Sequence, residues 1–235
     1  MSSILRYIFI TCSLLLMLNS AYGQNATDTA ADAPVIKLKD SASHQLCGAI
    51  DIFQPIMNHV LNYREGYEFE ADYYVKNEVY GVVEGGWGNA HFKSDKLDYT
   101  SSNSFFRVGF NKSLLPRVTK SDWDMVFIGL RYAMGFVQRS TATYTIVDSL
   151  WGNTTGTKPS ASFVGYWAEI TGGMRVELAK NFFVGYNIRG KFLLSQKAFQ
   201  TLAPVYVAGY GRGDKNSIFD FNFYLTYALR WKRHV

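Results

Sequence analysis

Alternation of apolar and polar residues with a period of two constrains this chain more than any other feature. Residues 67–73 (YEFEADY) and 219–231 (FDFNFYLTYALRW) both follow this pattern. In a β-strand successive side chains point to opposite faces, so a period of two is typical of a strand and does not fit the 3.6-residue period of a helix. The sequence therefore predicts an all-β protein.

Similar alternation occurs near residues 46–53, 79–87, 105–111, 126–136, 163–178 and 182–194, which gives eight expected strands. Several of them reach the 9–11 residues that a tilted strand needs to cross a bilayer. Long loops are expected at 55–65, 90–104, 137–162 and 195–217, and shorter connections at 76–78, 112–123 and 179–181. Long loops at one end and mostly short turns at the other are typical of outer-membrane barrels. The predicted fold is an eight-stranded antiparallel up-and-down transmembrane β-barrel.

The distribution of charge indicates which face of each strand meets lipid. In the apolar phase, which includes Phe69, Ile128 and Phe221, no position is charged, whereas the opposite phase carries many charges. A Lys or Arg on the lipid face costs about 2–4 kcal/mol at the bilayer midplane. We therefore expect apolar side chains to face lipid and ionised side chains to face the lumen. The alternative is a soluble calycin-like carrier with an apolar interior.

The expected lumen charges form a structural network. Acidic residues dominate the first three strands, and basic residues dominate strands four, five and seven. Across a ring of eight, strand one faces five and strand three faces seven, so we expect Asp51 near Arg131 and Glu84 near Arg189 or Lys191. Alternatively, the charges line a water-filled channel. The expected network is Asp51, Glu68, Glu70, Asp72, Glu84, Arg107, Arg131, Glu169, Arg175, Glu177, Arg189, Lys191, Asp220 and Arg230.

The N-terminus has the pattern of a secretory signal peptide. Arg6 precedes an apolar run, and small residues occupy positions 21 and 23, so residues 1–23 are expected to be removed. Residues 24–44 are small, polar and unpatterned, and we expect a flexible periplasmic leader. Residues 45–235 then form the barrel. Its expected location is the outer membrane of a Gram-negative envelope.

Composition excludes several functions. The net charge of +5 is spread without a Lys/Arg run, so nucleic acid is not an expected partner. No two of the 4 histidines stand at a metal-ligand spacing, and no Gly-rich phosphate loop follows a strand. We expect no catalytic, cofactor or metal site. The expected function is a structural or surface-interaction scaffold, with a narrow channel or a lipid-modifying enzyme as alternatives. Expected partners are outer-membrane lipid, the barrel-assembly machinery and an unknown surface ligand, and the chain is expected to be a monomer.

Four landmarks carry a family resemblance: FFRVG at 105–109, IGLRY at 128–132, WAE at 167–169 with GMRVE at 173–177, and NFFVG at 181–185. Over residues 45–232 the chain resembles an uncharacterised family of small outer-membrane β-barrel proteins from Bacteroidota, with the architecture of OmpA and OmpX barrels. The resemblance implies no activity. Such barrels commonly end on an aromatic residue, whereas here Trp231 precedes Lys-Arg-His-Val.

The same resemblance implies candidate O-glycosylation sites, because in that phylum an Asp-Ser or Asp-Thr pair followed by a small or apolar residue resembles the acceptor motif. The matching positions are Thr29, Ser41 and Ser149.

Overall fold

The computed structural model describes residues 43–60, 63–115, 123–147, 150, 152–195 and 203–232. The expected signal peptide (1–23) and nearly all of the expected leader (24–44) lie outside these ranges. The first strand begins at Ser43, two residues before the expected start of the barrel. Among the described residues, no helix is long and apolar enough to span a membrane.

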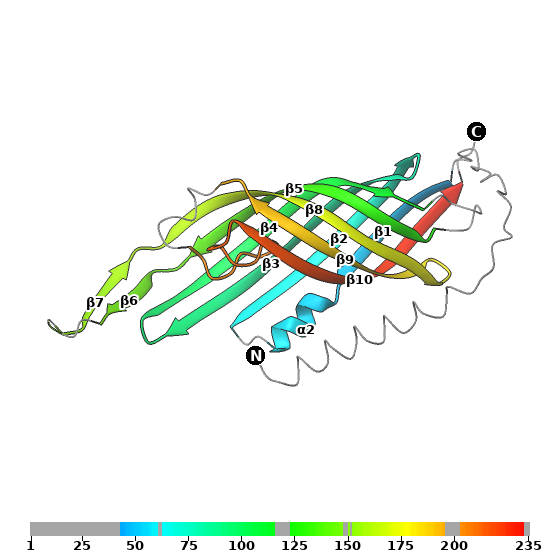
Figure 1. Ribbon diagram of the computed structural model, residues 1–235. Helices are drawn as coiled ribbons and strands as arrows, with labels where there is room; N and C mark the ends of the chain where they lie inside the picture. Colours follow the sequence, from blue (N-terminus) through cyan, green and yellow to red (C-terminus); the bar gives the residue numbers. More distant parts are fainter. Residues whose placement is uncertain are drawn as a thin grey trace, which may run out of the picture. The chain divides into compact units, whose positions relative to one another are not determined.

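Within these ranges the chain forms ten strands and one helix (Figure 1). The helix is α2 (Phe53–Val60). The strands are β1 (Ser43–Asp51), β2 (Arg64–Lys76), β3 (Val79–Ser94), β4 (Leu97–Ser113), β5 (Met125–Arg139), β6 (Ala142–Ile146), β7 (Thr154–Lys158), β8 (Ala161–Ala179), β9 (Phe182–Leu193) and β10 (Ser217–Lys232).

All of these strands except β6 and β7 form one closed antiparallel ring. Around it, β1, β2, β3, β4, β5, β8, β9 and β10 each pair with the next, and β10 pairs back with β1. Because neighbours in the sequence are neighbours in the ring, the barrel is of the up-and-down type. The predicted eight-stranded antiparallel barrel is confirmed for the described residues.

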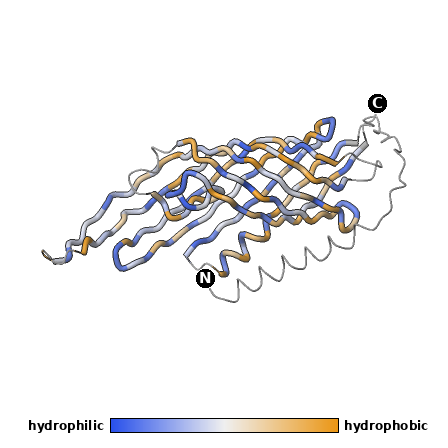
Figure 2. Tube along the Cα trace, viewed as in Figure 1, coloured by the Kyte–Doolittle hydropathy of each residue, from blue (hydrophilic) through white to orange (hydrophobic). Residues whose placement is uncertain are grey.

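Side chains alternate between the two faces of every barrel strand, as the period of two requires. On β5 the ring of Phe127 is 8% exposed and points into the lumen, whereas Ile128 is 50% exposed and points outward. Phe69 and Phe221 also point outward. The apolar residues are concentrated along the middle of the strands and the hydrophilic ones at the turns (Figure 2). Apolar residues thus cover the outside, the reverse of the soluble carrier considered above.

The expected loop at 90–104 is wrong. β3 and β4 remain paired out to Ser94 and Leu97, and the connection is a two-residue turn at Asp95 and Lys96. The physical reason lies in the outward positions, which change from apolar to polar near Asn89 and Ser102. The hydropathy signal therefore ends there, although the hydrogen-bonded ladder continues.

The expected loop at 137–162 contains a second hairpin. β6 and β7 pair through Ala142↔Lys158 to Ile146↔Thr154, and β6 also pairs with β4 at Leu97 and Asp98. These strands are short and rich in threonine, which favours extended structure without giving an apolar face. They extend from the end of the barrel that also carries the β3–β4 hairpin (Figure 1). We call this end the mouth.

The expected loop at 55–65 begins with the helix α2, which contacts β2 and β10. β1 ends at Asp51, opposite Tyr224, whereas β2 runs on towards the mouth. The exposed edge of β2 is completed by Asn58, whose Nδ2 donates to the Gly66 carbonyl at 2.9 Å while its Oδ1 accepts from the Gly66 N–H at 2.8 Å. One side-chain amide thus replaces the ladder bonds that a longer β1 would make.

Candidate functional site: the lumen and its mouth

The middle of the lumen holds three arginines and three glutamates, all of them buried. Arg107, Arg131 and Arg189 come from β4, β5 and β9, and they are 0%, 3% and 0% exposed. The glutamates come from β2, β3 and β8. We call these six residues the central charge cluster, and its acidic members are Glu68, Glu84 and Glu169.

Glu84 is the hub of this cluster. Its carboxylate accepts from Arg131 Nε at 2.8 Å and from Arg189 Nη1 at 2.5 Å, and it lies 2.9 Å from Arg107 Nη1. Arg107 also donates to Glu68 Oε2 at 2.6 Å. The expected approach of Glu84 to Arg189 therefore occurs. Charge-assisted bonds of this kind are short and about twice as strong as neutral ones.

Neutral side chains add further hydrogen bonds to the cluster, although Arg107 Nε is buried without a partner among the described residues. Trp167 Nε1 donates to Glu169 Oε1 at 2.6 Å, and the Tyr224 hydroxyl donates to Glu68 Oε1 at 2.5 Å. Arg189 Nη2 donates to the Tyr224 oxygen at 2.7 Å. Three positive and three negative charges in mutual contact leave the cluster formally neutral, which is the condition under which buried charges are tolerated.

Asp51 does not take the place expected for it. Its carboxylate accepts from Asn222 Nδ2 at 2.7 Å and from the Phe53 N–H at 2.9 Å, beside the start of α2, and Arg131 pairs with Glu84 instead. Tilted strands are staggered, so two facing strands bring residues together only at matching depth. Asp51 lies level with Tyr224 and not with Arg131.

The other expected lumen charges form separate pairs. Arg175 Nη1 lies 2.5 Å from Asp72 Oδ2, Lys191 Nζ lies 2.5 Å from Asp220 Oδ2, and Arg230 Nη2 lies 2.8 Å from Glu177 Oε2. Lys191 thus pairs with Asp220 and not with Glu84. Glu70 lies 3.8 Å from Arg189, at the edge of ion-pair distance.

The mouth side of the lumen is filled by residues 206–210 of the segment 203–216, which is part of the expected surface loop 195–217. Tyr206, Val207, Ala208 and Tyr210 are buried in one apolar cluster with side chains of the wall: Ala90, Phe105, Ala133, Val137, Trp167 and Leu193. The expectation that this loop lies outside is therefore wrong for residues 206–210. We call residues 203–216 the plug.

Specific contacts hold the plug in place. Lys191 Nζ donates to the Gly209 carbonyl at 2.6 Å, and the Tyr99 hydroxyl accepts from the Val205 N–H at 2.8 Å. Gly209 has a φ of +76°, and a Cβ there would lie 2.5 Å from Cγ of Phe105. Only glycine meets both conditions without strain.

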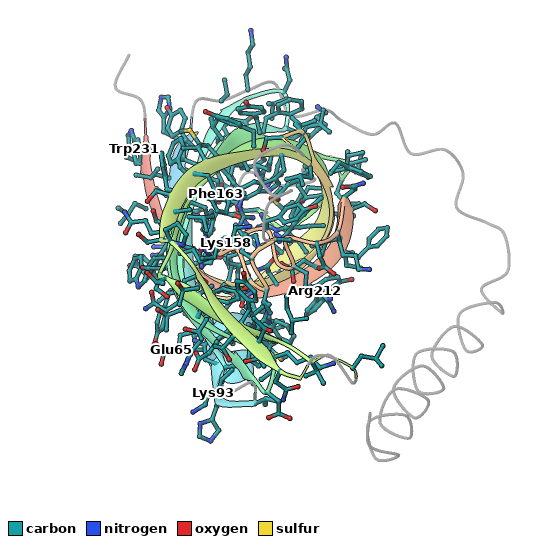
Figure 3. All side chains as sticks on the ribbon, turned by 90° about the vertical axis from the view of Figure 1, so that its left-hand side faces the viewer. Glu65, Lys93, Lys158, Phe163, Arg212 and Trp231 are labelled. Carbon is teal, nitrogen blue, oxygen red and sulfur yellow. The ribbon has the colours of Figure 1, made fainter. Side chains whose placement is uncertain are left out.

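A pocket of about 620 Å³ lies at the mouth end of the strands, and its lining comes from residues 63–65, 89–91, 100–102, 138–140, 160 and 162. Most of the side chains in its lining, among them Asn89, Ser102 and Gln138, belong to the outward phase of their strands, and the inward residues Arg64, Ala90, Ser101 and Arg139 lie between them in the sequence. The guanidinium of Arg64 lies 5.0 Å from the ring centre of Tyr206 in the plug. Burial raises the pKa of the Tyr206 phenol to about 12, so this contact is with a neutral ring. We call this cavity the mouth pocket, and Figure 3 looks onto this end of the barrel.

Sequence reasoning missed Arg64 and Arg139 as inward-facing residues of the barrel wall. Both continue the inward phase of their strands beyond the expected strand ends, Arg64 in line with Glu68 and Arg139 in line with Arg131. Extending the period of two by a few residues past the last apolar position would have found them.

No metal or glycosylation site can be placed on this structure. Among the residues that the structure describes, no group of three His, Cys, Asp or Glu side chains could hold a metal ion. The candidate glycosylation positions Thr29, Ser41 and Ser149 lie outside the described residues.

Comparison with solved structures gives likenesses at low identity. The attachment invasion locus protein Ail of Yersinia pestis matches with a TM-score of 0.39 and 9% identity, over 80% of this chain and 97% of that chain. Neisserial surface protein A (NspA) matches with a TM-score of 0.34 and 11% identity, over 82% and 97%. At these values the likenesses carry no argument about ligands or activity.

Two further comparisons concern the sequence itself. No curated protein matches the chain. A family model matches residues 4–233, which is nearly the whole sequence and includes every strand of the barrel. The chain belongs to the family described as a domain of unknown function, DUF6048.

Proposed function

We propose that this protein is an integral outer-membrane β-barrel with a closed, charge-paired lumen, and that it acts as a structural or surface-interaction scaffold through its mouth. The observation that carries the proposal is the uncharged outer wall. Outward positions 67–75, 79–87, 126–136, 164–178 and 219–231 hold no Asp, Glu, Lys or Arg on the five strands β2, β3, β5, β8 and β10. A wall of this kind suits acyl chains and not water.

The paired strands give this wall two polar borders. Towards the mouth, the outward side chains change from apolar to polar. On β3 the outward residue after Trp87 is Asn89, and on β5 the outward residue after Phe136 is Gln138. At the other end, β5 is preceded by Asp124. Between Val126 and Phe136 the strand rises about 34 Å, or roughly 26 Å across a membrane at a 40° tilt, which matches the usual belt of about 25 Å.

The length of the connections supports the orientation of the barrel. The turns at Asn77–Glu78 and Lys180–Asn181 are tight, whereas the opposite end carries α2, the β3–β4 hairpin, the β6–β7 hairpin and the plug. Outer-membrane barrels have short periplasmic turns and longer extracellular connections. On that basis the mouth faces the exterior, and surface partners would meet α2, the hairpins and the mouth pocket.

The central charge cluster and the plug favour a closed scaffold over a narrow channel. An open pore needs continuous water, whereas here Arg107, Glu84 and Arg189 fill the middle and the plug fills the mouth side. We infer that the monomer is complete in itself, with outer-membrane lipid and the barrel-assembly machinery as its partners. The alternative function is that of a lipid-modifying enzyme, which predicts altered lipid A or phospholipid in a strain lacking the gene.

Membrane fractionation with gel electrophoresis tests this proposal. The native protein should enter the outer-membrane fraction, require detergent for release, and migrate faster when it is not heated, because a closed barrel binds less detergent than an unfolded chain. In planar bilayers it should give no single-channel conductance. Release into detergent-free periplasmic extract would contradict the membrane location, and regular conductance steps would contradict the closed lumen.

A further inference from the structure

The barrel wall is interrupted between β2 and β10 near the mouth. β1 pairs with β10 as far as Asp51↔Tyr224 and with β2 as far as Ile50↔Phe69, whereas β2 and β10 both extend beyond these pairs towards the mouth. Within the described ranges, no strand lies between the part of β2 before Phe69 and the part of β10 before Tyr224. Instead α2 follows the end of β1 and contacts both strands (Figure 1). We call this part of the wall the seam.

Side chains satisfy backbone groups along the seam in place of a strand. On β2, the side-chain amide from α2 bonds to both the N–H and the carbonyl of Gly66. On β10, the Phe223 N–H donates to Asp51 Oδ1 at 3.2 Å. The Phe221 N–H donates to Asp220 Oδ1 at 2.9 Å. Edges whose backbone groups are already bonded do not need a further strand, so α2 is a built part of the wall.

The polarity of α2 is the reverse of that of a helix on the surface of a water-soluble protein. Its polar side chains Gln54 and Asn58, one turn apart, face the barrel: Asn58 bonds to Gly66, and a Cβ on Gly66 would lie 3.6 Å from Gln54 Oε1. The exposed side chains of α2 are all apolar: Ile56, Met57 and Val60. A helix in water turns its apolar side towards the protein, so the outer side of α2 suits apolar surroundings.

The apolar side of α2 is continuous with the outer wall of the barrel. The ring of Phe53, at the start of the helix, meets the outward ring of Phe221 edge-on with 5.6 Å between the ring centres. Phe221 in turn stacks on the outward Tyr186 of β9 at 5.8 Å. One turn later the helix reaches β2 at the residue before Tyr67, whose outward ring lies 5.9 Å from that of Trp87. α2 therefore runs from within the apolar wall to its border.

We propose that the apolar face of α2, formed by Phe53, Ile56, Met57 and Val60, is a lipid contact covered by acyl chains of the outer leaflet. These residues have the spacing i, i+3, i+4 and i+7, which places them on one side of a helix. α2 thus replaces the missing part of β1 in the lipid-facing wall. The inference rests on the proposed membrane location and deepens it, because it assigns the apolar face of α2 to lipid and leaves the hairpins to surface partners.

A spin label on the full chain in phosphatidylcholine vesicles tests this inference. The nitroxide is attached to Ile56→Cys, and its collisions with oxygen, which concentrates among acyl chains, are compared with its collisions with a water-soluble nickel complex. Ile128→Cys in the apolar wall is the lipid reference, and Thr157→Cys, at an exposed position of the β6–β7 hairpin, is the water reference. Because the native Cys47 is buried, only the added cysteine should react. The oxygen-to-nickel ratio at position 56 should lie near that at position 128.

The two references separate failure of this inference from failure of the proposed function. A ratio at position 56 near that at position 157, with a lipid-like ratio at position 128, overturns the inference and leaves the barrel in its membrane. A water-like ratio at position 128 contradicts the membrane location itself. Few collisions with either reagent at position 56 would show that protein covers α2, which also overturns the lipid contact. The gel shift of each labelled variant confirms that it is folded.

A charged substitution tests whether lipid holds α2 on the seam. Lysine is unfavourable among acyl chains and not in water, so in vesicles Ile56→Lys should speed exchange of the Gly66 amide, which donates to Asn58, by about fivefold. Ile56→Met is the matched control, because Met and Lys have similar length and helix propensity but Met carries no charge. Faster exchange in Ile56→Lys than in Ile56→Met supports the lipid contact, and equal exchange in the two variants overturns it.

Discussion

The middle of the lumen and its mouth use the same residue type in opposite ways. Arg107 lies 2.6 Å from one carboxylate oxygen and 2.9 Å from another, and both partners are buried with it. Arg139, which is also buried, donates to a single backbone carbonyl of Pro159. The paired arginines contribute to a closed structure, whereas Arg139 has no carboxylate partner among the described residues. Burial alone therefore does not define the role of a lumen arginine; its partners do.

The largest expected effect tests the paired region. Glu84→Gln removes the carboxylate that three arginines share and leaves buried positive charge uncompensated, so it should destabilise the barrel by about 3–5 kcal/mol. The measurement is the urea midpoint of the gel-shift transition in lipid vesicles. Glu65→Gln, at an exposed carboxylate of the mouth, is the matched control and should change the midpoint little. Equal effects of the two substitutions would remove the distinction between the regions.

A smaller effect is expected where the plug meets the wall. Gly209→Ala combines a positive φ with a close approach to Phe105, and it should destabilise the plug by about 1–3 kcal/mol. Protease cleavage within residues 203–216 of the membrane-embedded protein measures it, and faster cleavage is expected. Gly152→Ala is the control, since its φ is +79° but no atom lies within 4 Å of the new Cβ. If Gly152→Ala alone accelerated cleavage, the packing of the plug against Phe105 would be disproved.

The junction between α2 and β2 should respond more weakly. Asn58→Ala removes two hydrogen bonds to Gly66 and leaves the β2 edge partly unpaired, which should cost about 1–2 kcal/mol. Hydrogen exchange of the Gly66 amide should accelerate while exchange in the middle of β5 stays unchanged. Unaltered exchange at Gly66 would show that the amide does not replace the missing ladder.

The smallest effect on stability is expected for the unpaired arginines. Arg139→Gln removes a buried charge that has no carboxylate partner among the described residues, so the urea midpoint should stay within about 1 kcal/mol of the wild type or rise. If Arg139→Gln lowered the stability of the barrel as much as Glu84→Gln, Arg139 would belong to the stabilising network. The two regions would then not differ in how they use arginine.

Much of the fold could be predicted because alternation is strong wherever one face is apolar. Residues 126–136 alternate cleanly and lie within β5. The prediction failed near the mouth, where the outward face is polar and the period of two no longer appears in hydropathy. It also missed α2, a helix of 8 residues that begins two positions after a strand, because so short a segment gives little periodic signal.

The sequence predicted which charged residues face the lumen better than it predicted which of them form ion pairs. Glu84 and Arg189 meet because β3 and β9 face each other at equal depth. Asp51 and Arg131 do not meet, since depth depends on the stagger of tilted strands, which the order of strands alone does not give. The burial of Tyr206 and Val207 could not be predicted either, because a plug and an exposed loop have similar local sequences.

Two variants that each add one cysteine to β5 test the central claim most directly. Ile128 and Gln138 both point outward on β5, Ile128 within the apolar wall and Gln138 beyond its border, and the native Cys47 is buried. With the protein in intact lipid vesicles, a water-soluble maleimide should label Gln138→Cys and leave Ile128→Cys unlabelled until the barrel is unfolded. Equal labelling of both positions in the folded, vesicle-bound protein would contradict a wall immersed in lipid.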